Sequence, residues 1–409
     1  MLSRPVASRA GRGIESLVLL LAENGARAHE RERELARRVT AADAPPVILF
    51  GAGGLGRRLC ASLAAAGAPP TAFTDNDQRL WGTRVDGTTV LAPTEAAARY
   101  GVEGLFVVSV WNPRHAFVDT AQQLHGSGCR EVVSWIRLAW GLEAGDVLPL
   151  YSAGRPSSVL AAANHVTRAA SLWADSASRE EFERQVRWRL SGDFGDLAGP
   201  VADQYFPRDL LSLRAGEAFV DCGAFDGDTL RELVNRCPEF ASVDAFEPDP
   251  ANFAALEGCA AALTRPSDDR VRLHRAATDR EGGRRRFSAA GAAGAFVETP
   301  ASEAAGCEPA HGTRVPCVTL DDVLEGVPVT FIKMDVEGAE ADTLLGAQRL
   351  LRERRPVVAV SSYHHQADVW QLPALVAALT EDYRLHLRAH CPDGFDCVLY
   401  GIPVERGEP

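Results

Sequence analysis

Twice in this chain a short apolar run typical of a strand leads through a glycine turn into a helix-forming stretch. The first turn reads GAGGLG and the second DCGAFDGDT. An acidic residue follows each turn at the same spacing, Asp75 after Gly51 and Glu247 after Gly223. Such strand–turn–helix units build parallel sheets, so the pattern predicts an α/β protein with two Rossmann-like domains. The two turns differ in sequence, and an internal duplication is therefore not indicated.

The 409 residues exceed one ordinary core, so more than one domain is expected. Breaks in the apolar pattern predict an N-terminal helical segment at 1–44, a Rossmann-like nucleotide-binding domain at 45–141, a helical connector at 142–200 and a larger α/β domain at 201–409. In the last domain, five strands are predicted at 218–224, 242–248, 271–277, 330–336 and 356–362. YRLHLRAH and FDCVLYGIPV follow as a predicted antiparallel pair, and 282–312 as a hairpin with a long loop.

The composition opposes several classes of function. A net charge of −12 disfavours nucleic acid as the main ligand, because phosphate binding needs a basic surface. No apolar run approaches the roughly 18 residues of a membrane span. The scattered cysteines include no CxxC pair, which fits the reduced thiols of a cytoplasmic protein. We therefore expect a cytoplasmic enzyme that acts on a small-molecule acceptor, and a homo-oligomer stays open.

The second glycine turn combines glycines with acids. Gly223 and Gly227 allow a close approach of the backbone to a ligand, and the helix beyond them offers free N–H groups. Asp221 and Asp226 would repel a pyrophosphate but suit a cationic amino group or a sulfonium. Glu247, at the end of the next predicted strand, can bind both hydroxyls of a ribose. The turn thus favours a cofactor that carries an amino acid, and the alternative is an ordinary turn with a surface glutamate.

Five segments resemble, in order, the motifs of FkbM-type methyltransferases: DCGAFDGDT, FEPDPANFAAL, AATDREG, TLDDVL and KMDVEGAEADTLLGA. The resemblance covers about residues 200–409. Enzymes of this family are class I and depend on S-adenosylmethionine, and many methylate oxygen atoms of natural products or sugars. The resemblance therefore implies a seven-stranded sheet whose last strand is antiparallel, and a methyl transfer to a hydroxyl.

The resemblance also implies a cofactor site. Its predicted positions are Asp221, Gly223, Ala224, Phe225, Gly227, Thr229, Glu247, Pro248, Asp249, Ala276 and Asp335. Asp221, Gly223 and Gly227 would hold the methionine end of S-adenosylmethionine. Phe225 and Asp226 depart from the asparagine and small residue that are common at this place in the family.

The remaining matched positions follow later strands. Glu247 would bind the ribose, with Pro248 and Asp249 shaping the turn after it. Ala276 would lie against the adenine, and Asp335 would stand near the transferred methyl group.

The segment FIKMDVEGAE holds the only lysine of the chain, Lys333. Lys333 and Asp335 are two residues apart on a predicted strand and so share a face. Methyl transfer to a hydroxyl needs in-line positioning and removal of a proton. Lys333 is one candidate base, if burial removes its proton, and His364 is the other. His364 matches the histidine found at this place in the family, and His365 is the weaker candidate. The structural alternatives to a catalytic role are that Lys333 only pairs with a neighbouring carboxylate and that His364 only caps the end of a strand.

The same segment supplies carboxylates for a metal. Asp335 and Glu337 could bind Mg²⁺, which prefers a few carboxylates together with water. Several class I O-methyltransferases use such an ion to lower the pKa of the acceptor hydroxyl, so Mg²⁺ is a candidate cofactor.

The first glycine turn fits the dinucleotide fingerprint in both context and spacing. Gly51, Gly53, Gly54, Gly56 and Asp75 are its candidate residues for a nucleotide-type ligand. The segment also resembles Rossmann-like modules that precede sugar-modifying and acyl-transfer enzymes. Three alternatives stay open: a nicotinamide-dependent oxidoreductase, a nucleotide-sensing or scaffold protein, and a module that binds nothing and only packs or oligomerises.

Overall fold

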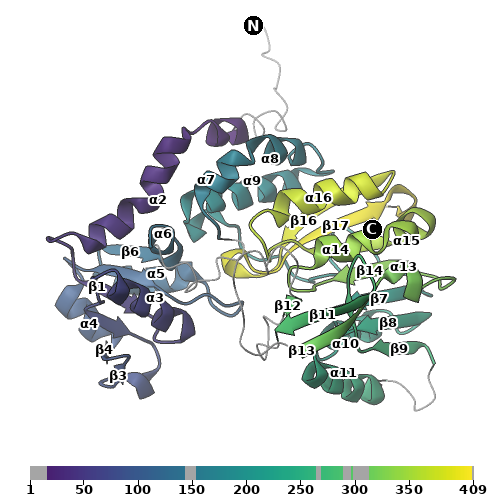
Figure 1. Cartoon of the computed structure of the whole chain (residues 1–409), viewed down its shortest axis with the longest axis horizontal. Helices are drawn as coiled ribbons and strands as arrows, with labels where there is room; N and C mark the ends of the chain where they lie inside the picture. The colour runs from purple at the N-terminus through teal and green to yellow at the C-terminus, as the bar shows by residue number, and fades with distance from the viewer. Residues whose placement is uncertain (1–15, 143–152, 264–268, 289–295, 298–312, 408–409) are drawn as a thin grey trace, which may run out of the picture. The chain divides into compact units, whose positions relative to one another are not determined.

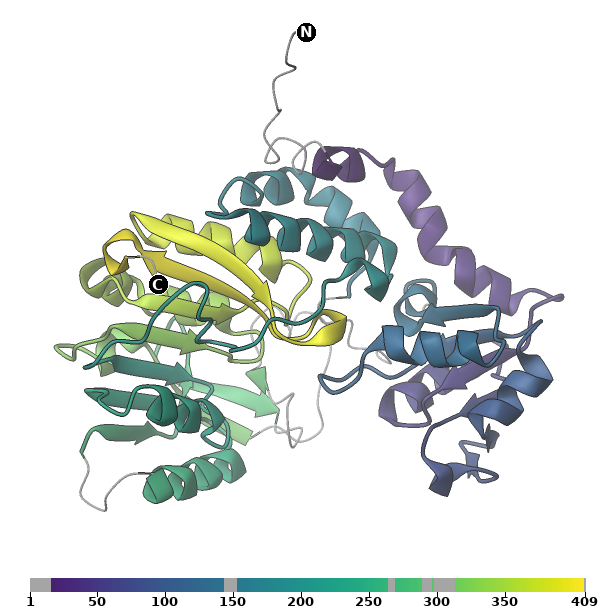
Figure 2. The same cartoon turned by 180° about the vertical axis from the view of Figure 1, so that it is seen from behind.

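The chain divides into two compact units in a computed structural model, shown from two sides in Figure 1 and Figure 2. The structure describes residues 16–142, 153–263, 269–288, 296–297 and 313–407. The first unit comprises 1–170, 179–200 and 389–396, and the second 171–178, 201–388 and 397–409. The division into four segments stays a prediction.

The first unit is built on a six-stranded sheet in the order β3-β4-β2-β1-β5-β6. Its strands are β1 (Val47–Phe50), β2 (Ala72–Thr74), β3 (Arg84–Val85), β4 (Thr88–Leu91), β5 (Leu105–Val108) and β6 (Glu131–Ser134). All neighbouring strands are parallel except β3 and β4, which form a hairpin. Asp86 and Gly87, both with positive φ, make its turn. This hairpin is absent from the sequence-based prediction.

Helices connect and flank these strands. They are α2 (Gly25–Thr40), α3 (Gly54–Ala65), α4 (Pro93–Tyr100), α5 (Phe117–Gly126), α6 (Trp135–Ala139), α7 (Pro156–Ala161), α8 (Ala163–Ala169) and α9 (Ser176–Ser191), whose first three residues belong to the second unit. The described part of the predicted connector is helical. Helix α2 contacts α6 and α7. A continuous core of strand residues and of Leu59, Leu63 and Leu124 from the helices fills the unit.

Residues 389–396 are part of the first unit although they join β16 (Tyr383–Ala389) to β17 (Cys397–Pro403). The indole Nε1 of Trp111 donates to the carbonyl of Asp393 at 3.0 Å. The carboxylate of Asp393 accepts from the backbone N–H of Phe117 at 2.8 Å. These bonds tie the connection to the segment after β5.

The second unit is built on a seven-stranded sheet in the order β16-β17-β15-β14-β7-β8-β9. Its other strands are β7 (Ala218–Cys222), β8 (Ser242–Phe246), β9 (Val271–His274), β14 (Phe331–Met334) and β15 (Val357–Ser361). Strands β15, β14, β7, β8 and β9 are parallel, and β17 is antiparallel to β15. The five predicted parallel strands are confirmed within a few residues, and the parallel sheet places their carboxyl ends along one edge.

Both faces of this sheet are covered at its centre, where β7, β14 and β15 are buried along their whole length. On one face Phe219 and Phe331 pack with Leu230 of α10 (Asp228–Arg236) and Leu256 of α11 (Pro250–Leu263). On the other face Gly401 lies close to Val358 and to Val376 of α16 (Asp368–Leu379).

The helices of this unit form two contacting groups, separate in both views (Figure 1 and Figure 2). One group is α10 with α11, and the other joins α13 (Leu320–Val323), α14 (Glu340–Leu345), α15 (Gln348–Arg354) and α16. This is the layered arrangement of an α/β fold.

A small four-stranded sheet adjoins this fold in the order β10-β13-β11-β12. Its strands are β10 (Ala277–Thr278), β11 (Gly283–Ser288), β12 (Phe296–Val297) and β13 (Thr313–Val318). The predicted hairpin at 282–312 is therefore present in β11 and β12, which pair antiparallel. Residues 289–295 and 298–312, where the predicted loop falls, lie outside the described residues.

Two further features bear on the class of protein. Within the described ranges, no helix combines the length and apolar character that a membrane crossing requires. The cysteines that the structure describes are all free thiols.

Candidate functional site

The glycine turn after β7 brings two strand ends into contact. Gly223 has φ +80°, and a Cβ added to it would lie 1.9 Å from the carbonyl oxygen of Asp335. Only glycine lets the turn after β7 approach the end of β14 so closely. The N–H groups of Gly223 and Ala224 both donate to the carbonyl of Phe246 at 3.0 Å, which ties the turn to the end of β8. The predicted motifs at the ends of β7, β8 and β14 therefore meet at one edge of the sheet.

Lys333 forms a buried ion pair at this junction. Its Nζ lies 3.0 Å from Oδ1 of Asp221, and the exposed fractions of the two side chains are 3% and 0%. The same ammonium donates to the carbonyl of Gly223 at 2.6 Å. Burial lowers the pKa of Lys333, but the charges of Asp221 and Asp335 outweigh it and hold this pKa above its ordinary value. The lysine is thus kept protonated, which opposes the predicted role as a base.

The carboxylate of Asp221 faces this lysine in the interior rather than an open space. The residue was predicted to hold the methionine end of a cofactor. Its position suits a supporting role instead, because the ion pair fixes the shape of the glycine turn that follows it. Thr229, another predicted contact, is also buried, and its backbone N–H donates to Asp228.

Glu247 follows β8 and binds the glycine turn. Its Oε2 accepts from the N–H of Phe225 at 2.9 Å, and its Oε1 accepts from the N–H of Asp249 at 2.8 Å. Asp249 in turn caps α11 through the N–H groups of Ala251 and Asn252. Each carboxylate oxygen has a second acceptor position, so Glu247 can still bind hydroxyl groups.

The remaining predicted cofactor residues lie in the glycine turn and just after β8 and β9. Phe225 has φ +47° and is 39% exposed, so its ring stands at the surface of the turn. Gly227 has φ +87° and precedes α10; it offers no side-chain cap, and of the first N–H groups of α10 that of Thr229 is bonded to Asp228. Ala276 is buried between β9 and β10, and Pro248 lies between Glu247 and Asp249. Glycine turn, acid and helix start are brought together as the sequence predicts.

His364 lies in a second cluster beyond β15. Its Nε2 is 3.4 Å from Oδ1 of Asp335 and 3.5 Å from Oε2 of Glu337. Its Nδ1 is 2.9 Å from Oε1 of Glu340. Burial lowers the pKa of His364, but the three carboxylates outweigh it and raise this pKa to about 10. The imidazole is therefore charged near neutral pH, which opposes its role as a base in this state. The side chain of His365 is 62% exposed and paired with Asp368, and its ring lies against Gly338.

Tyr205 links the two clusters. Its hydroxyl donates to Oδ2 of Asp335 at 2.8 Å, and Nζ of Lys333 lies 5.2 Å from the centre of its ring. Burial raises the pKa of Asp335, but Lys333, His364 and the Tyr205 hydroxyl together lower it, so the carboxylate is charged. The sequence analysis missed Tyr205, because nothing in the residues around it indicates a contact so distant in the chain.

Comparison with known proteins agrees with this geometry. Residues 221–390 match the family described as the methyltransferase FkbM domain. The matched segment, named the FkbM domain after this family, spans less than half of the chain. The match begins at Asp221 of the glycine turn and extends beyond His364, so both clusters lie within the FkbM domain.

A solved structure shares the fold over nearly the whole chain. It is methyltransferase FkbM from Methylobacillus flagellatus KT, with a TM-score of 0.72, 22% identity and coverage of 96% of this chain and 99% of that chain. Precorrin-6y C5,15-methyltransferase from Geobacter metallireducens GS-15 is a much weaker match, with a TM-score of 0.29, 11% identity and coverage of 47% and 83%. No curated protein matches the chain in sequence.

The glycine turn of the first unit lies outside the FkbM domain. Gly51 has φ +104°, and a Cβ on Gly56 would lie 1.9 Å from the carbonyl oxygen of Gly51. Gly53 caps α3 without a side-chain bond, and Gly53 and Gly54 have open space beside them. The carboxylate of Asp75 accepts from the N–H groups of Ala52 and Asp77. The predicted acid thus supports the loop itself.

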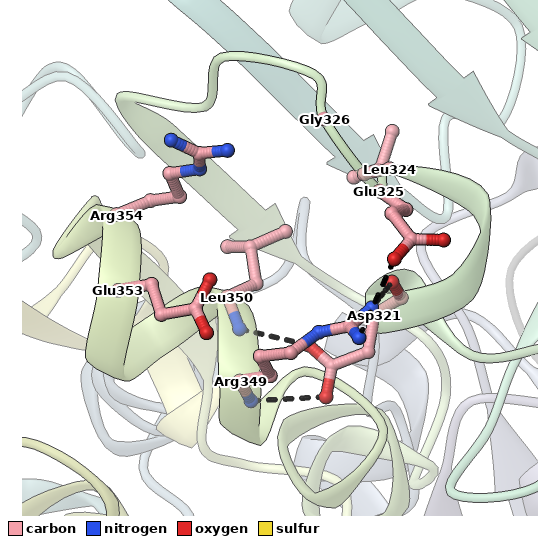
Figure 3. Close-up of a pocket in the computed structure, with 8 residues that line it drawn as sticks. All are labelled: Asp321, Leu324, Glu325, Gly326, Arg349, Leu350, Glu353 and Arg354. Atoms are coloured by element: carbon pink, nitrogen blue, oxygen red, sulfur yellow. Dashed lines mark hydrogen bonds and ion pairs between the residues drawn. The ribbon is translucent and has the colours of Figure 1, made fainter.

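A pocket of the FkbM domain lies at the opposite end of β14 (Figure 3). Its volume is about 290 Å³, and it lies between α13, the loop at Glu325 and Gly326, and α15. Asp321 closes one side by accepting from the N–H groups of Arg349 and Leu350. The loop precedes β14 whereas Asp335 follows it. None of the predicted site residues lines this pocket.

Proposed function

We propose that the FkbM domain uses S-adenosylmethionine to methylate a hydroxyl group of a small natural product or sugar-bearing substrate. The supporting observation is the position of Glu247, which binds the backbone of the glycine turn from the end of the adjacent strand. A carboxylate held in this way is preorganised for a ribose, and the open start of α10 offers N–H groups to a carboxylate. The cofactor supplies the methyl group when it is bound.

Asp335 is the predicted catalytic residue whose charge suits acceptance of a proton. Lys333 and His364 are both held in their protonated forms, whereas Asp335 is a carboxylate at the same sheet edge. Tyr205 orients this carboxylate, and His364 and Lys333 stabilise its charge. In this proposal Asp335 accepts the proton of the acceptor hydroxyl, and the cations of Lys333 and His364 hold the Asp335 carboxylate in position.

Calorimetry of the full chain with S-adenosylhomocysteine tests the proposal. We expect saturable binding, weakened in Glu247→Ala by about tenfold or more, since a hydrogen bond to a charged group contributes about 1.5–3 kcal/mol. Glu257→Ala is the matched control, because Glu257 is an exposed acid on α11. Absence of binding, or equal affinity in Glu247→Ala and the natural protein, would contradict the proposal.

For the first unit we propose a nucleotide-type ligand at the loop of Gly53 and Gly54, or a role in holding a homo-oligomer. The open N-terminus of α3 supports the first role. A fluorescence titration with NADH is the direct measurement, and it also tests the rival oxidoreductase function. We also propose a cytoplasmic setting, which free cysteines fit.

A further inference from the structure

We propose that His364, Asp335 and Glu337 bind a divalent transition-metal ion. The three side chains come from the turn after β14 and the loop after β15. One nitrogen, Nε2 of His364, faces one oxygen of each carboxylate, at 3.4 Å from Asp335 and 3.5 Å from Glu337. This inference concerns the metal-bound state, in which the ion takes the place of the proton on Nε2 of His364, and it does not rest on methyl transfer.

Two facing atoms of the cluster lack hydrogen bonds. Among the described residues, neither a side chain nor the backbone hydrogen-bonds Nε2 of His364 or Oδ1 of Asp335. His364 is only 5% exposed, and a buried polar atom without a hydrogen bond is costly. Both atoms point into the same space. A cation between them would satisfy both.

The outer oxygen of Asp335 is hydrogen-bonded, and the outer nitrogen of His364 lies beside a carboxylate without forming a hydrogen bond to it. Nδ1 of His364 lies 2.9 Å from Oε1 of Glu340, and Oδ2 of Asp335 accepts from the hydroxyl of Tyr205 at 2.8 Å. Glu340 is 1% exposed and is fixed by the backbone N–H groups of Val336 and Gly338. A carboxylate behind a metal-binding histidine fixes the ring and increases its basicity. This arrangement explains why Glu340 is buried beside His364.

The spacing suits a metal better than a hydrogen bond. Ligand atoms on a tetrahedral ion with bonds of about 2.0–2.1 Å lie about 3.4 Å apart. The two measured N–O distances have this value. The side chains of Asp335 and Glu337 are 24% and 31% exposed, so the cluster is accessible to solvent on the carboxylate side. Three protein ligands with one accessible side are typical of a metal that keeps a position for water or substrate.

The ligand set indicates which ion binds. An imidazole with two carboxylates suits Zn²⁺, Co²⁺ or Mn²⁺, whereas Mg²⁺ prefers oxygen ligands and retained waters. We therefore assign this site to a transition metal rather than to Mg²⁺ held by Asp335 and Glu337 alone. Glu340 is also a candidate ligand, since Asp335, Glu340 and His364 are the described residues whose possible ligand atoms all lie within 4.8 Å of one another. Its bonds to the backbone favour an orienting role.

Titration of the metal-depleted full chain with Co²⁺, followed by visible absorption, tests the site. We expect one equivalent to bind with ligand-field bands of a four-coordinate ion, and Zn²⁺ to displace it. His364→Ala should abolish this equivalent, and Glu340→Gln should weaken it about 10–100-fold. His365→Ala is the matched control, because His365 is the adjacent histidine and is exposed and paired with Asp368, and it should leave the affinity unchanged.

Two results would overturn the assignment. One is the absence of saturable Co²⁺ binding to the natural chain. The other is an equivalent that persists in His364→Ala, since the ion would then bind elsewhere, for example at a thiol. Thermal unfolding of each variant checks that it folds, and Glu337→Gln supplies a milder change that should also weaken binding. The S-adenosylhomocysteine titration is independent of these results, so either proposal can fail alone.

Discussion

Nζ of Lys333 lies 3.0 Å from Oδ1 of Asp221, and the parallel pairing of β14 with β7 places these two residues in direct register. The only lysine of the chain therefore forms a cross-strand ion pair in the middle of the larger sheet. Because Gly223 accepts a bond from the same ammonium, the pair also determines the path of the glycine turn.

Lys333→Met should destabilise the second unit strongly. Removing one partner of a buried ion pair leaves the other charge uncompensated, which costs about 3–5 kcal/mol. Urea denaturation measures the loss. The double variant Lys333→Met with Asp221→Asn should be more stable than Lys333→Met alone, because no buried charge is left unpaired. Equal stability of Lys333→Met and the natural protein would show that the pair is not formed.

Gly223→Ala should disrupt the site, whereas Gly326→Ala should be tolerated. Both glycines have positive φ, +80° and +74°, so either substitution introduces backbone strain of about 1–2 kcal/mol. Only at Gly223 would the new Cβ meet a backbone atom, the carbonyl oxygen of Asp335 at 1.9 Å, while at Gly326 nothing lies within 4 Å. We expect Gly223→Ala to lose stability well beyond that strain in urea denaturation. Similar losses in the two variants would refute the close approach of the two strand ends.

Tyr205→Phe should cost more stability than Tyr383→Phe. The hydroxyl of Tyr205 donates to the charged Asp335 at 2.8 Å, and that of Tyr383 donates to the neutral carbonyl of Pro356 at 2.7 Å. A hydrogen bond to a charged group contributes about 1.5–3 kcal/mol, against about 1 kcal/mol for a neutral one. Thermal and urea unfolding of both variants give the comparison. The reverse order would mean that Tyr205 does not anchor the carboxylate.

Asp175→Asn should lower stability in a pH-dependent way. Burial raises the pKa of Asp175, but hydrogen bonds from His386, Arg388 and Ser178 outweigh it and hold this pKa far below its ordinary value. A lowered pKa in the folded state stabilises the protein above the ordinary value of about 3.9, and this contribution is lost as the pH falls below it. The variant should therefore be less stable by about 2 kcal/mol at about pH 5, with a smaller difference at about pH 3. A difference that stays constant between these two pH values would rule out the linkage.

The strands were predictable where their residues are buried on both faces. VILF is an uninterrupted apolar run, FIKM is apolar except for Lys333, and both form central parallel strands. The β3–β4 hairpin was missed although Asp86-Gly87 is a recognised turn signal, because its first strand has only two residues, Arg84–Val85. A strand this short carries no periodic pattern.

The sequence predicted which segments form the site, but not which residues contact one another within it. Glycine turns, the acid after β8 and the residues after β14 were identified because local sequence determines strand ends. The partners of Glu247 and Asp221 were not, because they depend on how the turn closes against a neighbouring strand. Tyr205 reaches Asp335 across 130 positions of sequence, and no local pattern encodes such a contact.

The connection between β16 and β17 limits how this protein can be divided. Its residues 389–396 belong to the first unit, while the strands on both sides of it belong to the second. A fragment that starts at residue 201 would carry Asp393 without Trp111 and Phe117, its hydrogen-bonding partners. No single cut of the polypeptide yields either unit with all of its own residues. We therefore expect a fragment that starts at residue 201 to lose these two bonds and to be less stable than the same residues in the full chain.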